Sequence, residues 1–344
     1  MARRDRPRVT LEDVARHAGV SRATASLVAR NSPLIAEKTR QKVLKSMKEL
    51  GYVYDRIASN LRSRSSRIVG VIIAEIANPY FSELLAGVHE KLDRDGYTVI
   101  LGTTYGSREK QDRLIATMME NRVGGMILSP AADITPELVE RIRDWGIPVV
   151  MFAREVATGT EFDYIGVDNV LGGRMATEHL IGLGHRRIAY LGGPSSSSAW
   201  RDRRLGYRTA LEQHGIPADE GLILNTPDTR EGGRQGVLDL FARTDPPTAL
   251  FCYNDIVALG AMQGLRQMGL APGRDVAVIG FDNIPESEQT FPSLTTISAF
   301  PKRIGMMAAE LLHERMNGLD RQPFRQILRP ELVVRETSGS RRDG

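Results

Sequence analysis

The chain has 344 residues, of which 41% are hydrophobic and 26% are charged, so it is long enough for two or three folded domains. This composition excludes a disordered protein, and no apolar run approaches the roughly 18 residues that a membrane-spanning helix needs. The single cysteine, Cys252, excludes an internal disulfide and a cysteine-rich metal site. No apolar signal sequence follows the first residues, so we expect a cytoplasmic protein without a membrane partner.

The charge is distributed unevenly along the chain. Residues 1–67 contain 16 lysines and arginines and 6 acidic residues, whereas the remainder contains 30 basic and 36 acidic residues. The net charge of +4 therefore combines a strongly basic N-terminal segment with a mildly acidic body. Such a segment favours a polyanionic partner, and the alternative is a basic tail that only improves solubility.

Two short helices are predicted within the basic segment. Thr10 can cap the first, over residues 11–18, because its first turn is acidic and its apolar residues recur at helical spacing. Gly19 ends this helix, and Ser21 is a candidate cap for a second helix over residues 22–29. The buried face of the second helix is predicted to hold three residues, Ala25, Val28 and Ala29. This pattern is typical of a helix-turn-helix unit.

A third helix is predicted over residues 37–50, and Gly51 is its expected stop. Its apolar stripe comprises Val43, Leu44, Met47 and Leu50. Lysines populate the rest of the surface. They fit either a solvated face or contacts with phosphates, and these two interpretations are compatible.

The residues from Val9 to Thr24, together with Leu50-Gly51-Tyr52 and the segment 58–63, resemble the signature of the LacI/GalR family of bacterial repressors. The similarity continues along nearly the whole chain. It implies a homodimer in which the second helix of each subunit reads one half of a near-palindromic, double-stranded DNA operator. The candidate DNA-binding residues in this part of the chain are Thr10, Ser21, Arg22, Ala23, Thr24, Ser26, Leu27 and Asn31.

The predicted reading helix departs from the family pattern. Family members commonly have Val-Ser-Arg-Val-Leu-Asn where this chain has the six residues 25–30, so Leu27 replaces an arginine that often touches the operator. A leucine can meet a thymine methyl group but cannot make a bidentate contact with guanine. We therefore expect an operator that differs from the commonest family sites, with Arg22 as the remaining long donor.

Residues 57–63 match the hinge of the family, within a hinge and linker expected over residues 55–67, after a helix-turn-helix domain expected over residues 1–54. The resemblance implies that the hinge forms a short helix when two subunits sit together on DNA. Leu61 would then be a wedge between base steps in the minor groove, and Ala58 would allow close approach to DNA. The alternative role for Leu61 is an accessory core contact.

From residue 68 onward, short apolar runs alternate with amphipathic helices. Such runs are typical of buried parallel strands. Strands are predicted over residues 68–73, 98–101, 125–128, 149–152, 187–191, 222–224, 248–252 and 276–281. In the first half, helices are predicted over residues 80–95, 107–121 and 135–144.

The repeated pattern predicts an α/β core of two doubly wound, parallel-sheet lobes over residues 68–338. This is the architecture of type I periplasmic binding proteins, which the family's core also has. The resemblance assigns residues of about 68–167 and 298–327 to an N-lobe, and about 168–297 and 328–338 to a C-lobe. The chain is then expected to cross between the lobes near 167–169, 296–300 and 326–329.

A small polar effector is expected at the carboxyl ends of the strands, where the two lobes face one another. A sugar, a sugar acid or a related metabolite would suit the polar residues found there. The candidate effector-binding residues are Tyr80, Phe81, Arg154, Asp168, Trp200, Arg203, Asn254 and Asp282.

Several of these candidates have a structural alternative. Tyr80 and Phe81 could equally be core residues at a helix start, Asp282 could cap a helix, and Trp200 could simply pack on a lobe. Many sugar-responsive relatives carry an aspartate where this chain has Ala153 followed by Arg154. This departure favours an effector with an acidic group.

No nucleophile–base pair, phosphate-binding loop or metal-ligand spacing occurs in the sequence, so we expect no enzyme, no cofactor and no metal. The favoured function is a transcriptional regulator, expected to be a repressor, under the control of a small effector. One alternative is the same regulator responding to a phosphocarrier protein. Another is a solute-binding protein, which the missing signal sequence and the DNA-reading segment disfavour.

Overall fold

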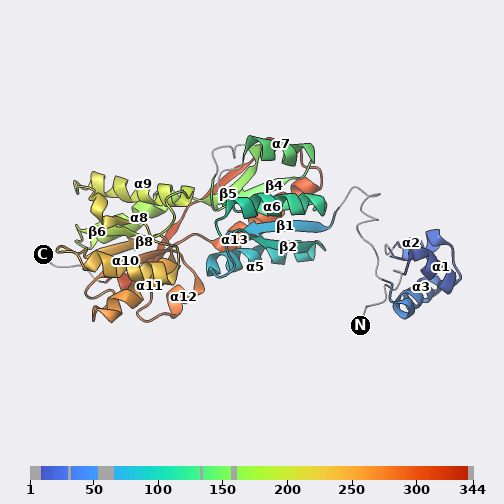
Figure 1. Cartoon of the computed structure of the whole chain (residues 1–344), viewed down its shortest axis with the longest axis horizontal. Coiled ribbons are helices and arrows are strands. Elements are labelled where there is room, and N and C mark those ends of the chain that lie inside the picture. Colours follow the sequence, from blue (N-terminus) through green and yellow to red (C-terminus); the bar gives the residue numbers. More distant parts are fainter. Residues whose placement is uncertain (1–8, 30–31, 53–65, 132–134, 156–160, 340–344) are drawn as a thin grey trace, which may run out of the picture. The chain divides into compact units, whose positions relative to one another are not determined.

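The computed structural model describes residues 9–29, 32–52, 66–131, 135–155 and 161–339. It divides the chain into two compact units, residues 1–65 and residues 66–344. The first unit contains three helices among its described residues (Figure 1), namely α1 (Leu11–Ala18), α2 (Arg22–Ala29) and α3 (Glu37–Leu50). They match the three helices that the sequence predicts.

Local signals define the ends of these helices. The Thr10 hydroxyl accepts a hydrogen bond from the Asp13 N–H (3.3 Å), and the Asp13 carboxylate accepts one from the Thr10 N–H (2.9 Å), which makes a capping box. Gly19 and Gly51 end α1 and α3 in the left-handed conformation that glycine adopts without strain. The buried core of the unit consists of Val14, Ala15, Ala18, Ala25, Val28 and Val43.

Two details of this unit differ from the prediction. Leu44 is 43% exposed, and Ala29 is only half-buried. Adjacent residues of an α-helix lie about 100° apart around its axis, so the face that buries Val43 turns Leu44 toward solvent. The stripe of α3 that packs on the core is therefore Val43, Met47 and Leu50.

The described residues of the second unit form two six-stranded sheets, and the first of them is entirely parallel. Its strand order is β11-β5-β4-β3-β1-β2. The strands are β1 (Ile68–Ile73), β2 (Thr98–Thr103), β3 (Gly125–Leu128), β4 (Val149–Phe152), β5 (Asp163–Val167) and β11 (Arg325–Leu328). The helices around it are α5 (Pro79–Arg94), α6 (Arg108–Glu120), α7 (Pro136–Asp144) and α13 (Pro301–Met316).

The side chains of β1 point alternately to the two faces of this sheet, which explains why helices cover both faces. Val71 and Ile73 belong to the same hydrophobic cluster as the buried residues of α5 and α13. Ile72 belongs instead to the cluster that includes α6 and α7. Because successive strand residues point to opposite faces, a continuous apolar run such as β1 requires cover on both sides.

The second sheet has the order β12-β10-β9-β8-β6-β7. Its strands are β6 (Ile188–Leu191), β7 (Ile223–Leu224), β8 (Ala249–Cys252), β9 (Ala277–Asp282), β10 (Thr295–Ser298) and β12 (Glu331–Val333). Helices α8 and α9 lie on one side of it and α10 and α11 on the other (Figure 1). The helices are α8 (Asn169–Gly182), α9 (Ser198–Gln213), α10 (Arg230–Phe241), α11 (Asp255–Gln267) and the short α12 (Pro285–Gln289).

The predicted fold class is confirmed, with a helix-turn-helix unit followed by two doubly wound lobes. One strand departs from it, because β12 pairs antiparallel to β10. The chain passes between the two sheets after β5, after β10 and between β11 and β12, so three segments connect the lobes. Among the described residues, no helix has the length and apolar character needed to cross a bilayer.

Candidate functional site

The N-terminal end of α2 is the most exposed part of the helix-turn-helix unit's second helix. The Ser21 hydroxyl accepts a hydrogen bond from the Thr24 N–H (3.1 Å), so Ser21 caps α2. Arg22 and Ala23 are exposed, and the Arg22 guanidinium reaches only to 4.0 Å from the Glu12 carboxylate. A long cation at the exposed start of a helix is placed to reach base edges or phosphates.

The remaining candidates on this unit are less exposed. Thr24, Ser26 and Leu27 are half-buried, while Thr10 is exposed at the start of α1. Three further candidates, Asn31, Ala58 and Leu61, lie outside the described residues, as does nearly all of the predicted hinge over 55–67. Their proposed contacts with DNA stay predictions from the sequence.

A cavity lies between the two lobes of the second unit, at the carboxyl ends of the strands. Its volume is about 40 Å³, which suits a few water molecules. A sugar-sized molecule therefore requires the lobes to move apart. The cavity is lined by residues from both lobes, which are Asn78, Tyr80, Phe81, Ala153, Arg154, Val167, Ala199, Arg203, Asp228, Tyr253, Asn254 and Asp282.

Arg203 is the best-held polar side chain of the cavity. It comes from α9 and is only 6% exposed. Its Nε donates to the Asn169 Oδ1 (2.9 Å), and its Nη1 donates to the carbonyl oxygen of Tyr253 (2.5 Å). The guanidinium also lies 3.5 Å from the centre of the Phe281 ring. Two hydrogen bonds and a stacked ring fix both the position and the plane of this cation.

Asp282 faces this arginine at the end of β9. One of its carboxylate oxygens lies 3.6 Å from the Arg203 Nη2, and the residue is 5% exposed. Burial raises the pKa of its carboxyl group to about 8, although Arg203 opposes this shift. Asp282 and Asn283 have positive φ angles of 113° and 57°, a strained backbone that is often found at functional sites.

Asn254 connects the cavity to the next helix. Its side-chain oxygen accepts a hydrogen bond from the Val257 N–H (2.9 Å) and so caps α11. Asp255 lies behind it, is fully buried, and accepts hydrogen bonds from the hydroxyls of Ser287 and Thr296. Burial raises the pKa of Asp255 to about 6. Asp255 therefore stabilises the loop that directly follows Asp282, without lining the cavity itself.

The predicted residues that the N-lobe contributes to the cavity are two aromatic side chains and one arginine. Tyr80 and Phe81 begin α5, are nearly buried, and meet edge to face with ring centres 5.2 Å apart. They line the cavity and also belong to the hydrophobic core, so the core role weighed from the sequence is present, and their contact with an effector stays a prediction. Arg154 follows Ala153, whose φ of 61° turns the chain sharply after β4.

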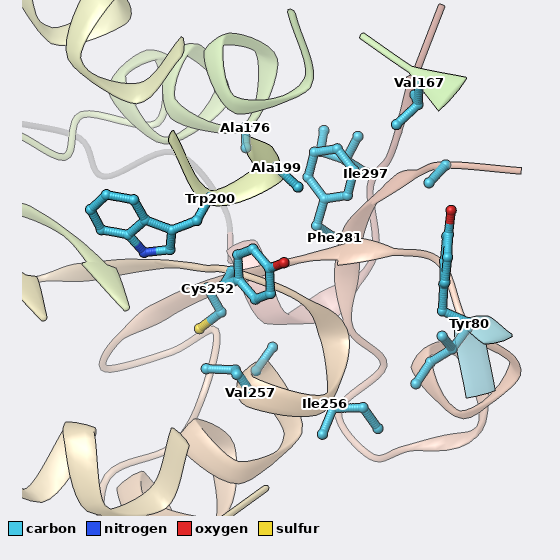
Figure 2. Packing of buried hydrophobic residues seen from close by; sticks show 14 of the residues in the cluster. Tyr80, Val167, Ala176, Ala199, Trp200, Cys252, Ile256, Val257, Phe281 and Ile297 are labelled. Atoms are coloured by element: carbon cyan, nitrogen blue, oxygen red, sulfur yellow. The ribbon is translucent and has the colours of Figure 1, made fainter. Parts of the chain in front are cut away.

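Two predicted site residues do not line this cavity. Asp168 caps α8 by accepting a hydrogen bond from the Leu171 N–H (2.8 Å). The Trp200 indole donates to the carbonyl oxygen of Gly192 (2.9 Å) and packs against Tyr190 in the C-lobe core. Figure 2 shows Trp200 and Tyr80 on opposite sides of Phe281. The turn of α9 that points Arg203 into the cavity directs Trp200 into the core.

Three polar lining residues were not predicted from the sequence, namely Asn78, Asp228 and Tyr253. Asn78 caps α5 by accepting a hydrogen bond from the Tyr80 N–H (3.0 Å). Tyr253 directly follows β8, and Asp228 follows β7 at the start of α10. Their position after a parallel strand was the available signal, since the same rule singled out Asn254 and Asp282.

Comparison with known proteins agrees with these two units. Residues 10–55 match the model of the bacterial regulatory proteins of the lacI family, and residues 177–338 match a periplasmic binding protein-like domain. The HTH-type transcriptional repressor PurR of Vibrio vulnificus (strain CMCP6) is 36% identical over 338 residues, covering 95% of this chain and 98% of the relative. The chain belongs to the LacI family.

Solved structures of LacI-family proteins have the same architecture. The Lac repressor dimer bound to operator and the anti-inducer ONPF matches with a TM-score of 0.83 and 29% identity, over 97% of this chain and 100% of that one. The transcriptional regulator CelR in complex with cellobiose matches with a TM-score of 0.73 and 32% identity, over 96% of this chain and 100% of that one. The chain thus matches these regulators of transcription over nearly its whole length.

Proposed function

We propose that this LacI-family chain is a homodimeric, sequence-specific transcriptional repressor whose DNA binding is controlled by a small polar effector. The observation that carries this proposal is the pairing, in one chain, of two separate binding devices. One is a basic helix-turn-helix unit with Arg22 exposed at the start of α2. The other is an inter-lobe cavity with a buried Arg203–Asp282 pair.

Coupling between the two devices follows from the connections between the lobes. A ligand that binds more tightly to one lobe arrangement shifts the population toward it. Because both β1, which follows the hinge segment in sequence, and the cavity residues Tyr80 and Phe81 belong to the N-lobe, movement of that lobe can be transmitted to the segment before it. Coupling of this kind is reciprocal, so operator DNA would change effector affinity by the same factor.

A second copy of this chain is the proposed partner of the N-lobe. Strand β2 is an edge of its sheet and carries Ile100 and Leu101, which are 39% and 38% exposed. Tyr105, just beyond it, is 60% exposed. Apolar side chains along an unpaired strand edge favour association. The related Lac repressor structure is that of a dimer bound to operator.

The proposal is tested by selecting genomic duplexes that bind the purified full-length chain and comparing them with random duplexes of the same length. We expect specific binding that falls steeply with salt. Arg22→Ala should weaken binding to the selected duplex by about 10-fold to 100-fold, the value of one good base contact. Arg16→Ala, at an exposed position of α1, is the matched control and should affect binding to selected and random duplexes equally.

Failure to prefer any duplex over random DNA would contradict the regulator function. Equal loss of duplex binding and of effector binding in Arg22→Ala would contradict the separation into two devices. The effector itself is sought by thermal unfolding of the full chain against sugars, sugar acids and purine bases, because a ligand selective for the folded core raises its apparent stability.

A further inference from the structure

The turn that leaves strand β9 is strained where it passes the inter-lobe cavity. Asp282 ends the strand with a φ of 113°, and Asn283 follows with a φ of 57°. Asparagine adopts the left-handed region more readily than most residues, but two positive φ angles in succession persist only where the surroundings hold them. Because the Asp282 carboxylate faces Arg203 in the cavity, the contacts that hold this turn also set the position of that carboxylate.

Arg335 holds the turn through its side chain, although it does not line the inter-lobe cavity. Its Nη2 donates a hydrogen bond to the Asn283 Oδ1 (2.9 Å), and its Nη1 donates to the carbonyl oxygen of Leu294 (2.9 Å). Asn283 and Leu294 are the first and last residues of the segment that connects β9 to β10. One guanidinium group thus ties together both ends of this connection.

The backbone around Arg335 is itself fixed. The Arg335 N–H donates to the Thr295 Oγ1 (2.9 Å), and the Glu336 carboxylate accepts a hydrogen bond from the Ser293 N–H (2.7 Å). Strand β12, which ends two residues before Arg335, pairs with β10, and β10 in turn pairs with β9. The chain passes between the lobes after β10 and before β12, so Arg335 lies where two of the lobe crossings meet the turn.

Filling of the hydrophobic core does not explain this arginine. Arg335 is half-buried and lines an open groove of about 430 Å³ together with Asn283 and Ile284, so its replacement would leave no void in the core. The buried carboxylate of Asp255 already holds the same loop from the interior, where it accepts a hydrogen bond from the Ile284 N–H (2.9 Å). Arg335 adds a hydrogen bond to the side chain of Asn283, the residue next to Asp282.

We propose that Arg335 is a positioning residue of the effector site, which holds the Asp282 carboxylate in place beside Arg203. It acts through the side chain of Asn283 and does not touch the ligand. A preformed acceptor loses less conformational entropy when a ligand binds, so the arginine raises effector affinity from outside the cavity. Because the turn is tied to two crossing strands, the placement of Asp282 also depends on the arrangement of the lobes. This proposal rests on the proposed effector function.

The direct test compares crystal structures of the full chain and of its Arg335→Ala variant. Without the guanidinium, the strained turn is no longer held, so we expect Asn283 to leave the left-handed region and the Asp282 carboxylate to move away from Arg203. Arg335→Lys retains the charge and one donor group, and it should keep the turn closer to its parent conformation. An Asp282 carboxylate in the same place in the parent and in Arg335→Ala would overturn the proposal.

The pH dependence of stability tests the same placement in solution. Burial raises the pKa of Asp282 to about 8; Arg203 opposes this shift, while Asp255 and Asp228 add to it. A carboxyl group whose pKa is raised by folding stabilises the folded chain at low pH and loses this contribution as the pH rises toward 8. In Arg335→Ala the Asp282 carboxyl group gains water and its pKa falls, so urea unfolding should show a smaller loss of stability between pH 5 and pH 8. Two profiles that differ only by a constant offset would contradict the positioning role.

Arg266→Ala is the matched control for these measurements. The exposed Arg266 of α11 also donates to a carbonyl oxygen of the segment between β9 and β10, but this carbonyl belongs to Phe291, which lies far along the segment from Asp282. Its loss should lower the stability and leave the pH profile parallel to that of the parent. A change of slope as large as that in Arg335→Ala would assign the effect to general loosening of the loop and overturn the proposal.

Asn283→Ala tests whether the arginine acts through this side chain. The variant loses the acceptor for Arg335, and alanine adopts a positive φ less readily than asparagine, so its pH profile should resemble that of Arg335→Ala. Combining the two changes should add little, with an interaction of about threefold or more in the unfolding equilibrium constant, whereas independent residues multiply within about twofold. Independent effects would show that Arg335 does not act through Asn283.

Ligand affinity separates this proposal from the proposed function. The probes are D-glucose, D-glucuronate and adenine, each titrated into the full chain by calorimetry. A probe that binds the parent should bind Arg335→Ala about tenfold more weakly, the value of one hydrogen bond to a charged group, and should bind Arg266→Ala with unchanged affinity. Equal affinity in Arg335→Ala and the parent would overturn the positioning role.

The remaining outcomes concern the proposed function alone. If Asp282 moves in Arg335→Ala but no probe binds the parent, the arginine places Asp282 as proposed, and it is the effector class of the proposed function that is wrong. If the full chain binds no duplex specifically, the regulator function fails, whatever the effect of Arg335.

Discussion

The two sides of the inter-lobe cavity are built differently. The C-lobe side consists of buried polar groups that hold one another, with Arg203 bonded to Asn169 and to the Tyr253 carbonyl, and with Asp282 beside it. The N-lobe side is formed mainly by the Tyr80 and Phe81 rings, which pack edge to face, and by Arg154, whose guanidinium has no hydrogen bond or ion pair among the described residues. Its other polar side chain, Asn78, caps α5.

This difference suggests a division of tasks. Groups on the C-lobe side are fixed before any ligand arrives, so they supply orientation at little entropic cost. The N-lobe side offers apolar shape and one adjustable cation, so its contacts can form as the lobes close. Substitutions on each side of the cavity test this division.

The largest effect is expected for Arg203→Ala on the C-lobe side. It removes the donor to the Asn169 side chain and to the Tyr253 carbonyl and leaves both buried oxygens without this partner, so stability should fall by about 2 kcal/mol or more. The effector response should be lost while operator binding is retained in the folded fraction. Urea unfolding and effector titrations of a DNA-binding assay measure the two quantities.

Arg174→Ala serves as the control for this loss. Arg174 forms an exposed pair with Glu178 one turn along α8, and such pairs contribute about 0.3–0.5 kcal/mol. If Arg203→Ala responds to the effector as the parent does, this arginine does not belong to the effector site. The hypothesis of a preformed C-lobe side would then be wrong.

A smaller effect is expected for Asp282→Asn, seen in the pH dependence of stability. Burial raises the pKa of Asp282 from 3.8 to about 8, so the folded chain binds this proton more tightly than the unfolded chain. The contribution is complete below pH of about 4 and declines as the pH rises toward 8. Asparagine cannot ionise, so the variant should lose less stability than the parent between pH 5 and pH 8.

Urea unfolding at these two pH values provides the measurement, and Asp239→Asn, at an exposed position of α10, is the control that should follow the parent. An identical pH slope in Asp282→Asn and the parent would mean that Arg203 keeps Asp282 ionised throughout. The C-lobe side would then be a plain ion pair.

The smallest effect is expected for Tyr80→Phe on the N-lobe side. The ring stays, so the edge-to-face contact with Phe81 and the burial of the side chain are retained. Stability should change by less than about 0.5 kcal/mol, and effector affinity by a few-fold at most. A loss as large as that of Arg203→Ala would show that both sides bind through fixed polar groups, and the comparison would fail.

The helix-turn-helix unit was predicted well because its signals are local. Thr10 with Asp13, and glycines at 19 and 51, mark helix ends within a few residues of where they act. The prediction that Leu44 belongs to the buried stripe was wrong. Val43 and Leu44 are neighbouring apolar residues that cannot both face the core, and only packing against α1 and α2 determines which of them is buried.

The lobes were predicted less completely. Strands β5, β10, β11 and β12 were not identified as strands, although their positions near the lobe crossings were expected. β11 and β12 are edge strands with mixed exposure, so they lack the continuous apolar runs that identify β1 or β9. β11 pairs with residues more than a hundred positions away, as Arg325 with Tyr164 illustrates, and β12 pairs antiparallel with β10, from 33 to 37 positions away.

The sequence alone determined the basic reading unit, the family and the two-lobed class, because caps, periodicity and charge are properties of neighbouring residues. The tertiary structure decided which side chains meet in the cavity. It placed Asp228 and Tyr253 there, turned Trp200 into the core, and brought Arg335 against Asn283. Such neighbours are brought together only when distant strands pair and the lobes close on each other, so no local pattern encodes them.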